Sequence, residues 1–527
     1  MSRATYFWLA LLGLGVGLFI SHFQTVPGYM DAEYYYSGAV RLASGFGFTE
    51  EILWNYLDDP EGLPHPSHGY WMPLVSILAA SGMRLLGSID FESARIPILI
   101  LYASIPPLTA ALSFAITEKS DLSKLAGLFA VVPGFYIPYL TTTDSFVLYM
   151  LFGTIFFLLM RATWLELTPG YPFLASVLLG VLAGLMHLTR ADGILWLAVA
   201  FLVLYIQGHE IGGLRYVSLL ICICIFGYLL IMGPWMIRNW RVFGALFAPG
   251  GFRTLWLTNY DEIFIYPAQT LTAGRWFASG MQKIIQDRIW AFGQNLQTTL
   301  AVQGGILLVP MVLTSLWHLR SDRRIQVAVL AWCLTLFVMT ITFPYSGARG
   351  GFFHSGAALQ TMWWALAPYG LYQIIAWIGE MRDWKIDQAQ RVFRYGVLGI
   401  VLVIAVVVFY TRVVGSDLTN PVWSNSPRHY MELELILREF GAQSGDVVMV
   451  NNSPGYFAAN GRESISIPYG DLDTTLNLAK QYRARYLLLE INQLVGDDGL
   501  YDEPGDRPGF DYLGSFKDTR IYQFLFP

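Results

Sequence analysis

The sequence is poor in charged residues and in cysteine. Charged residues make up 13% of the 527 positions, against about 25% in typical soluble domains. Hydrophobic residues reach 55%, and the mean hydropathy is +0.46. The three cysteines, Cys222, Cys224 and Cys333, all lie in uncharged stretches, which excludes a disulfide framework and a CxxC metal site. The composition therefore predicts an integral membrane protein.

The charge of the sequence does not indicate a nucleic-acid partner. The net charge is -5, and residues 413–527 hold 16 acidic against 9 basic residues. A nucleic-acid-binding domain instead carries a basic patch or stripe. We therefore expect membrane lipid as a partner and no nucleic acid.

Long hydrophobic runs fill most of the chain. A helix needs ~20 apolar residues to cross a bilayer, and the sequence on this basis predicts about 11 spans, including residues 4–23 and 125–143. Residues 72–83 are too short to span and predict an interfacial helix in a large first outer loop, residues 24–91. The expected fold is mainly α, with a polytopic transmembrane domain over residues 1–412.

Residues 413–527 alternate between helical and strand patterns, which predicts a small C-terminal α/β domain. The predicted elements are a helix at 426–440, strands at 446–450 and 464–468, a helix at 472–483, a strand at 485–490 and a hairpin at 511–526. The segment NNSPGYFAANGR lacks the glycine spacing of a dinucleotide-binding loop. We expect this domain to be accessory or acceptor-binding rather than catalytic.

The distribution of Lys and Arg predicts the orientation in the membrane. Short, mostly basic loops, among them residues 161–170 and 318–324, are predicted to be cytoplasmic. An odd number of spans then places the first loop and the C-terminal domain together on the extracytoplasmic side.

Residues suited to chemistry gather in the segments predicted to face outside. Carboxylates are costly inside hydrocarbon, so a first loop rich in acids, tyrosines and histidines indicates a functional site. The candidates are Asp31, Glu33, Tyr35, His65, His68 and Tyr70 in the first loop, and Asp144, Arg190, Arg238, Arg349 and His354 in later outer segments. Together they offer a base and a clamp for an anion.

Several motifs resemble one family of membrane enzymes. The chain shows DAEYYY, then HPSHGYWMPL, then LLGSIDFESARIP, and later GPWMIRNWRVFGALF. In this order the motifs are similar to those of GT-C type glycosyltransferases that use polyprenyl-phosphate sugars, the class of protein O-mannosyltransferases and the bacterial aminoarabinose transferase. The resemblance implies a multi-pass protein of the plasma (bacterial inner) membrane with an extracytoplasmic active site.

The family resemblance also implies a reaction and roles for the candidates. The expected reaction is inverting transfer of one hexosyl or pentosyl unit from a polyprenyl-phosphate donor to a hydroxyl of a protein, lipid or glycan. Asp31 matches the family's first-loop catalytic acid, and Asp144 matches a second acidic position. The usual Glu directly after the first acid is replaced by Ala32; Glu33, which follows, lies on another helix face and is the weaker candidate.

This chain lacks the cation that the family pattern places at the donor phosphate. The aminoarabinose-type enzymes place a lysine before their PPL sequence, where this chain has Met72. Arg238 is the first choice for the phosphate contact. It belongs to an Arg-Asn pair at the end of a span, where a guanidinium can donate two hydrogen bonds to a phosphate. The further candidates are Arg349, His354 and Arg190, and the substrate-binding candidates are Tyr35, His65, His68 and Tyr70.

Other interpretations stay open for several of these residues. Asp31 could cap a helix starting at Ala32, and Arg190 could pair locally with Asp192. His65 and His68 have a spacing found in metal sites, but no helix holds it; we expect no required cofactor and leave a divalent metal open. The rival functions are a transporter or flippase, a glycan ligase or oligosaccharyltransferase, and a non-enzymatic scaffold.

Overall fold

The structure, a computed structural model, describes residues 1–160, 170–491 and 499–526. The predicted cytoplasmic loop at 161–170 lies almost wholly outside them. Two compact units divide the chain. Unit 1 comprises Met1–Phe23, Ile96–Arg238 and Asp287–Leu418, and unit 2 comprises Gln24–Arg95, Asn239–Gln286 and Thr419–Pro527. Each unit is thus assembled from three separate stretches of sequence.

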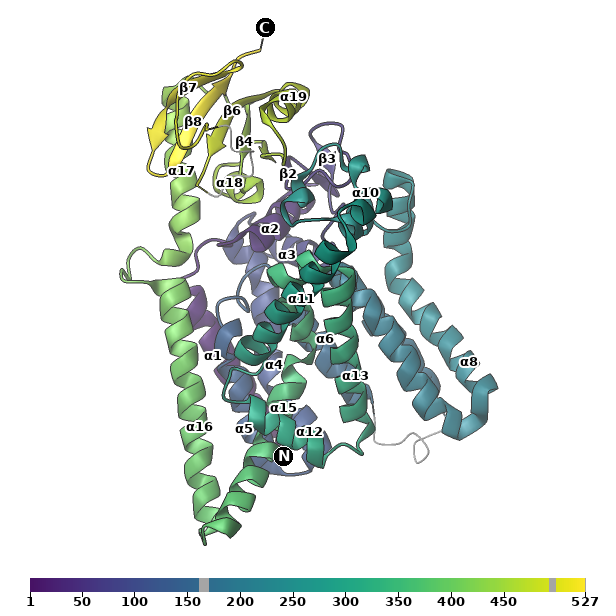
Figure 1. The fold of residues 1–527 in the computed structure, drawn as a ribbon. Helices are drawn as coiled ribbons and strands as arrows, with labels where there is room; N and C mark the ends of the chain where they lie inside the picture. Colours follow the sequence, from purple (N-terminus) through teal and green to yellow (C-terminus); the bar gives the residue numbers. More distant parts are fainter. Residues whose placement is uncertain (161–169, 492–498, 527) are drawn as a thin grey trace. The chain divides into compact units, whose positions relative to one another are not determined.

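Unit 1 is a bundle of helices, drawn in Figure 1 from purple to green. Its helices are α1 (Arg3–Ser21), α4 (Phe91–Thr117), α5 (Ser120–Val131), α6 (Phe146–Leu159), α7 (Tyr171–Thr189), α8 (Leu195–Phe243), α11 (Met281–Thr298), α12 (Val309–His318), α13 (Arg323–Phe337), α14 (Pro344–Ser346), α15 (Phe352–Met381) and α16 (Ile386–Phe409). The boundary with unit 2 falls inside α4, α8 and α11.

Six helices in the described part of the chain are long and apolar enough to cross a membrane. They are Arg3–Ser21, Phe91–Thr117, Tyr171–Thr189, Ala191–Phe243, Arg323–Thr342 and Ile386–Val414. The longest, with 53 residues, bends at Gly212 and Gly213, and Gly213 has a φ of +65° that glycine adopts readily. The chain is a multi-pass membrane protein, and the number of 11 spans stays a prediction.

Helix α15 lies at the centre of unit 1 and is buried along most of its length. Side chains of neighbouring helices donate hydrogen bonds to its backbone: Ser113 Oγ to Ala365 O at 2.9 Å and Ser315 Oγ to Leu366 O at 2.7 Å. Such bonds between helices stabilise membrane bundles, where lipid offers no hydrogen-bond partners. Because α15 is fixed by several neighbours, a residue at its first turn is held in a defined place.

The approach of α6 to α15 depends on a glycine, which gives a first testable prediction. A Cβ built at Gly153 would lie 1.9 Å from the carbonyl oxygen of Ala358. Gly153→Ala should therefore force the helices apart and lower the free energy of unfolding by ~1–3 kcal/mol. Gly15→Ala on α1 is the control, since a Cβ at Gly15 meets nothing within 4 Å. Thermal unfolding in detergent compares them, and equal midpoints would contradict this packing.

Unit 2 contains a six-stranded sheet in the order β2-β5-β4-β6-β8-β7. The strands are β2 (Ile52–Leu53), β4 (Val447–Val450), β5 (Ser464–Ser466), β6 (Ala484–Leu489), β7 (Phe510–Phe516) and β8 (Thr519–Phe524). Neighbours from β2 to β6 are parallel, whereas β6 with β8 and β7 with β8 are antiparallel. The predicted C-terminal α/β domain is present.

Helices cover both faces of this sheet. Val448 and Val450 of β4 pack with residues of α17 (Asn425–Glu439) and α18 (Ser453–Asn460), whereas Val447 and Met449 pack with residues of α19 (Leu472–Tyr482). Alternation of side chains along a strand explains this division. Both faces are thus buried, as expected for parallel strands.

The first loop is built into the same unit. It contributes α2 (Met30–Ala43), β1 (Thr49–Glu50), β2, β3 (His65–Pro66) and α3 (Leu74–Leu86), and α3 confirms the helix predicted at 72–83. Strand β2 pairs with β5 of the C-terminal region, and Tyr56 donates a hydrogen bond to the carbonyl of Ser466. The expected domain boundary at residue 413 stays a prediction, while the contacts group the C-terminal region with the first loop.

A third segment completes unit 2. It carries α9 (Pro249–Arg253) and α10 (Ala273–Ala278). Arg253 pairs with Asp59 of the first loop at 2.6 Å and donates a hydrogen bond to the carbonyl of Leu57, also at 2.6 Å. The backbone N–H of Ala268 donates to the other oxygen of Asp59 at 2.6 Å. Asp59 therefore holds this segment to the first loop.

Candidate active site

Asp144 follows an irregular segment between α5 and α6. Helix α5 ends at Val131, so the span predicted over residues 125–143 is wrong in its second half. Pro133 lacks a backbone N–H, and Gly134 has a φ of +58°, so the helix does not continue there. Asp144 itself is only 1% exposed. Irregular backbone in a membrane protein is tolerated where protein surrounds it or where it lines a cavity.

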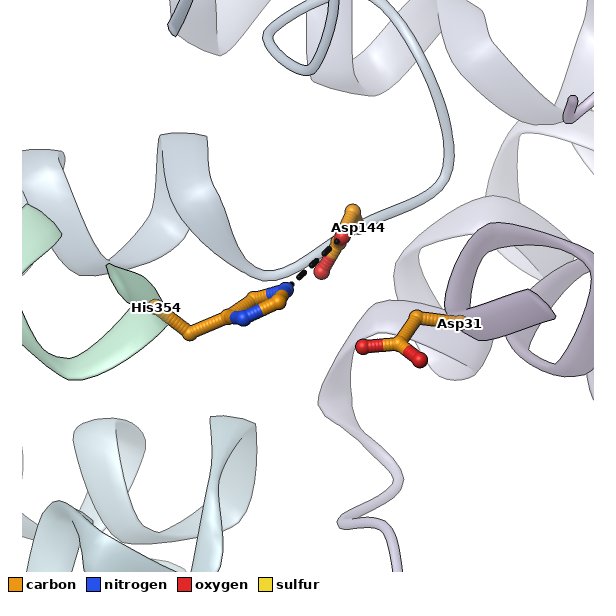
Figure 2. A group of neighbouring side chains, drawn as sticks. All are labelled: Asp31, Asp144 and His354. Atoms are coloured by element: carbon orange, nitrogen blue, oxygen red, sulfur yellow. Dashed lines mark hydrogen bonds and ion pairs between the residues drawn. The ribbon is translucent and has the colours of Figure 1, made fainter. Parts of the chain in front are cut away.

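The carboxylate of Asp144 contacts the imidazole of His354. Oδ2 of Asp144 lies 3.2 Å from Nε2 of His354, while Oδ1 accepts hydrogen bonds from the hydroxyl and the N–H of Ser145. Figure 2 shows the carboxylate–imidazole pair, with His354 at the first turn of α15. The imidazole also stacks on Phe146, with ring centroids 4.2 Å apart. Sequence reasoning named both residues but did not pair them.

The second nitrogen of His354 determines where its proton resides. Nδ1 lies 2.9 Å from the carbonyl oxygen of Gly350, and a carbonyl only accepts hydrogen bonds, so Nδ1 carries a proton. Gly350 adopts a φ of +116° in the π-helical turn Gly347–Gly351, a conformation that favours glycine. Nε2 is therefore either a donor to Asp144 or a lone pair that can bind a cation.

Arg190 forms an ion pair with Asp192, which is one of the two interpretations considered for it. Its Nε donates to Asp192 Oδ1 at 2.9 Å, and Tyr149 OH donates to the other oxygen of Asp192 at 3.2 Å. All three residues belong to unit 1. A contact of Arg190 with the donor phosphate stays a prediction.

The other two arginine candidates differ in their surroundings. The guanidinium of Arg238 lies over the ring of Trp235, 4.7 Å from its centroid. Arg349 is exposed and belongs to the same π-helical turn as Gly350. Arg349 therefore sits directly beside the residue that orients His354.

Asp31 lies in the first turn of α2 in unit 2. The helix begins at Met30, its N-cap is Tyr29, and no side chain makes the capping hydrogen bond. Asp31 is therefore not the cap of a helix starting at Ala32, which removes the structural alternative for this residue. A carboxylate in the first turn also benefits from the positive end of the helix dipole.

Glu33 is fully buried, in contrast to Asp31. Its Oε2 accepts a hydrogen bond from Nδ2 of Asn452 in the C-terminal region at 2.9 Å. Burial, together with repulsion from Asp31 and Glu490, raises the pKa of the Glu33 carboxyl to about 7, although the bond from Asn452 opposes this shift. The structure thus gives Glu33 a structural contact, and its catalytic role stays a prediction.

The four substrate-binding candidates of the first loop lie among aromatic and polar neighbours in unit 2. Tyr35 is 1% exposed and packs against Trp71. His65 pairs with Asp58 at 2.7 Å, whereas His68 is bracketed by the hydroxyls of Ser67 and Ser76 at 2.8 and 3.1 Å. The two histidines therefore have separate partners, which does not favour a shared metal.

Tyr70 belongs to an aromatic cluster of the same loop. Its ring lies 5.0 Å from that of Trp54, which stacks on Trp71 at 4.1 Å. Trp54 and Trp71 are largely buried. The cluster therefore forms part of the core of the loop, and a role for Tyr70 in binding sugar stays a prediction.

Sequence reasoning missed Asn452. The segment NNSPGYFAANGR contains helix α18, which is capped by the side chain of Asn452. On sequence grounds this segment was considered only as a phosphate-binding loop, whose glycine spacing it lacks. An Asn followed by Ser-Pro is a helix-start signal, because Asn caps and Pro suits the first turn. Applying that signal would have found the helix, but not its partner Glu33, 419 residues away in sequence.

Solved structures share this fold. Apo ArnT from Cupriavidus metallidurans matches with a TM-score of 0.57 and 12% identity, over 99% of this chain and 98% of its own. The apo oligosaccharyltransferase of Archaeoglobus fulgidus matches with a TM-score of 0.58 and 12% identity, over 93% of this chain and 69% of its own. No protein-family model matches the sequence, and no curated protein does.

Some of these neighbours contain lipid phosphates. ArnT is also known bound to undecaprenyl phosphate, with a TM-score of 0.55, 12% identity and 98% of each chain covered. AglB from Archaeoglobus fulgidus is known with an inhibitory peptide and a dolichol-phosphate, and the oligosaccharyltransferase of Archaeoglobus fulgidus is also known with Zn and sulfate. This chain thus has the GT-C glycosyltransferase fold, as its sequence motifs indicated.

Proposed function

We propose that this protein is a membrane glycosyltransferase that moves a single sugar from a polyprenyl-phosphate donor to an acceptor hydroxyl. The observation that carries the proposal is the match to ArnT over nearly the full length of both chains, including ArnT bound to undecaprenyl phosphate. The acceptor is a protein, lipid or glycan. We place the reaction on the extracytoplasmic face of the plasma membrane, opposite the basic loops.

The proposed reaction is one inverting displacement. The acceptor oxygen forms a bond to the anomeric carbon as the bond from that carbon to the phosphate oxygen breaks, and polyprenyl phosphate leaves with the electron pair. Asp31 takes the proton of the acceptor hydroxyl. Arginines stabilise the charge that develops on the departing phosphate. Asp31, in the first turn of α2, is the proposed base, and Arg238 and Arg349 are the proposed cations.

A divalent cation is part of the proposal. Asp144 and His354, both in unit 1, offer a carboxylate oxygen and an imidazole nitrogen 3.2 Å apart, and carboxylate and imidazole are common metal ligands. The bond from His354 Nδ1 to the carbonyl of Gly350 is the type of outer contact that orients a ligating imidazole. A bound cation would neutralise charge on the phosphate.

Two arginines are proposed to contact the donor phosphate, and we expect Arg349 to contribute more than Arg238. Arg349 adjoins Gly350, the partner of His354. Arg349→Ala should weaken donor binding by ~10-fold or more, the worth of a charge-assisted hydrogen bond, with a smaller loss for Arg238→Ala. Titration of purified variants with polyprenyl phosphate measures this. Arg391→Ala, at the exposed start of α16, is the control, and equal affinity of all variants would place the phosphate elsewhere.

A second candidate function is oligosaccharyl transfer. The similarity to AglB supports it, and such an enzyme would also use Asp31 and a lipid-linked donor. The two functions differ in the size of the glycan and in the number of phosphates on the donor. The fuller mutual coverage with ArnT favours a single sugar.

A donor panel tests the proposal. Purified protein is incubated with polyprenyl-phosphate monosaccharides and with lipid-linked oligosaccharides, and consumption of each donor is followed by mass spectrometry. Consumption of one monosaccharide donor supports the proposal. Consumption of oligosaccharide donors alone supports the second candidate, and flipping of labelled lipid across vesicles without any consumption would support a flippase instead.

A further inference from the structure

The carboxylate of Glu33 is anchored in the C-terminal region of the chain. Its Oε2 accepts from Nδ2 of Asn452 at 2.9 Å, and a Cβ built at Gly455 would lie 2.7 Å from the same oxygen. The side chain is completely buried. Only a glycine at position 455 allows the carboxylate to lie this close to the start of α18.

The amide of Asn452 has both of its ends engaged. Its Oδ1 accepts from the N–H of Gly455 at 3.1 Å and so caps α18, while its Nδ2 donates to Glu33. The N–H of Gly455 requires an acceptor, which is the amide oxygen, and the carboxylate of Glu33 requires a donor, which is the amide nitrogen. These two partners therefore fix the orientation of the Asn452 amide. One residue thus starts α18 and binds α2.

Helix α18 is itself held firmly in unit 2. The hydroxyl of Ser453 donates to the carbonyl of Leu53 in β2 at 2.8 Å, and Ser464 of β5 donates to the carbonyl of Ser453 at 2.9 Å. At the other end, Asn460 donates to the carbonyl of Tyr430 in α17 at 3.1 Å. A residue bound to the start of α18 is therefore bound to the sheet.

Helix geometry connects this anchor to Asp31. Residues 31 and 33 both belong to the first turn of α2. At 3.6 residues per turn, two residues apart in a helix project about 200° apart around its axis. Fixing Glu33 against α18 therefore places Asp31 on the side of α2 opposite the contact with Asn452.

We infer that Glu33 and Asn452 are positioning residues, through which the C-terminal region sets the rotation of α2 and so the direction of the Asp31 carboxylate. The inference rests on the proposed function only in assigning Asp31 as the base. The contact between the two helices stands on its own geometry. It also gives the C-terminal region a role in catalysis that needs no contact with substrate.

The test uses Asn452→Ser in the full-length protein. Serine keeps a capping oxygen for α18 but lacks the amide that reaches Glu33. We expect turnover to fall by ~10-fold with little change in KM for the donor, because a small misplacement of a catalytic group costs rate. Glu33→Ala should behave alike and the double variant no worse than either, whereas Glu33→Gln, which keeps an accepting oxygen, should retain most activity.

Asn460→Ala is the matched control, since it removes a hydrogen bond of α18 that does not involve α2. Hydrogen exchange of residues 30–43 is the second readout, and it does not depend on activity. It should quicken in Asn452→Ser and Glu33→Ala, and stay unchanged in Asn460→Ala and in Asp31→Asn. If neither the wild type nor any variant transfers sugar, the proposed function is wrong. Hydrogen exchange of residues 30–43 would still test the contact between Glu33 and Asn452.

Three results would overturn the inference. One is unchanged exchange of α2 in a folded Asn452→Ser variant. Another is wild-type turnover in both Asn452→Ser and Glu33→Ala. The third is a Glu33→Gln variant as impaired as Glu33→Ala, which would mean that the charge of Glu33, rather than its hydrogen bond, is what matters.

Discussion

Asp31→Asn should lower the rate of sugar transfer by at least ~100-fold, the lower end of the range for loss of a general base. Asparagine keeps the size of the side chain and much of its hydrogen bonding, but it cannot take the acceptor proton. Asp31 is not the cap of α2, so the variant should fold normally. Donor affinity should change little, because the proposed phosphate contacts belong to arginines. Single-turnover transfer and donor titration on purified protein measure both quantities.

The control for this variant is Glu61→Gln in the same loop. Glu61 is an exposed acid of unit 2, and its loss of charge matches that of Asp31→Asn. It should leave transfer and donor affinity unchanged. An Asp31→Asn protein that transfers sugar at close to the wild-type rate would remove Asp31 from the chemistry and leave the proposed base unassigned.

Asp144→Asn is expected to lower transfer by ~10- to 100-fold, the usual cost of losing a group that orients or shares a metal ligand. The variant removes the carboxylate that His354 contacts at 3.2 Å. It also removes one anionic member of the proposed cation site. The concentration of divalent cation that gives half-maximal transfer should therefore rise. Transfer is measured over a series of cation concentrations after treatment with a chelator.

Asp121→Asn serves as the control, because Asp121 is exposed and its ion pair is with Lys124, at 3.3 Å. Its cation dependence should equal that of the wild type. If chelation leaves wild-type transfer intact, the proposed cation is wrong, although Asp144 could still orient His354. If Asp144→Asn also transfers normally, the carboxylate–imidazole pair has no part in the reaction.

Local patterns in the sequence were sufficient to predict much of the fold. The C-terminal strands and helices appear close to their predicted places because each has its own periodicity and turn signals. Strand β2 could not be found in this way. Ile52 and Leu53 form a strand only by pairing with β5, more than 400 residues later, and two residues carry no periodicity.

The irregular segment before Asp144 was missed for a related reason. Its residues are apolar enough to resemble a span, and hydropathy does not record that Pro133 and Gly134 end the helix. A span count from hydropathy treats such a buried loop as helix. The acid itself was found, because a carboxylate in an apolar setting is conspicuous in the sequence.

Among the site residues, chemical type was predictable and pairing was not. Asp144 and His354 were each chosen for their chemistry, yet their contact joins positions 210 residues apart. Glu33 was chosen as an acid near Asp31, and helix spacing correctly set it on another face of α2. What that face contacts depends on Asn452, which no pattern in the first loop indicates.

The most direct test of the central claim identifies the lipid product of one turnover. Purified protein is mixed with its acceptor and with a polyprenyl-phosphate monosaccharide that was consumed in the donor panel. The masses of the lipid and of the acceptor are then measured by mass spectrometry. The account predicts free polyprenyl monophosphate in equal amount to acceptor that has gained the mass of one sugar, and formation of both products at least ~100-fold more slowly with Asp31→Asn. Intact donor recovered in full alongside unmodified acceptor, or an acceptor that gains a whole oligosaccharide, would contradict it.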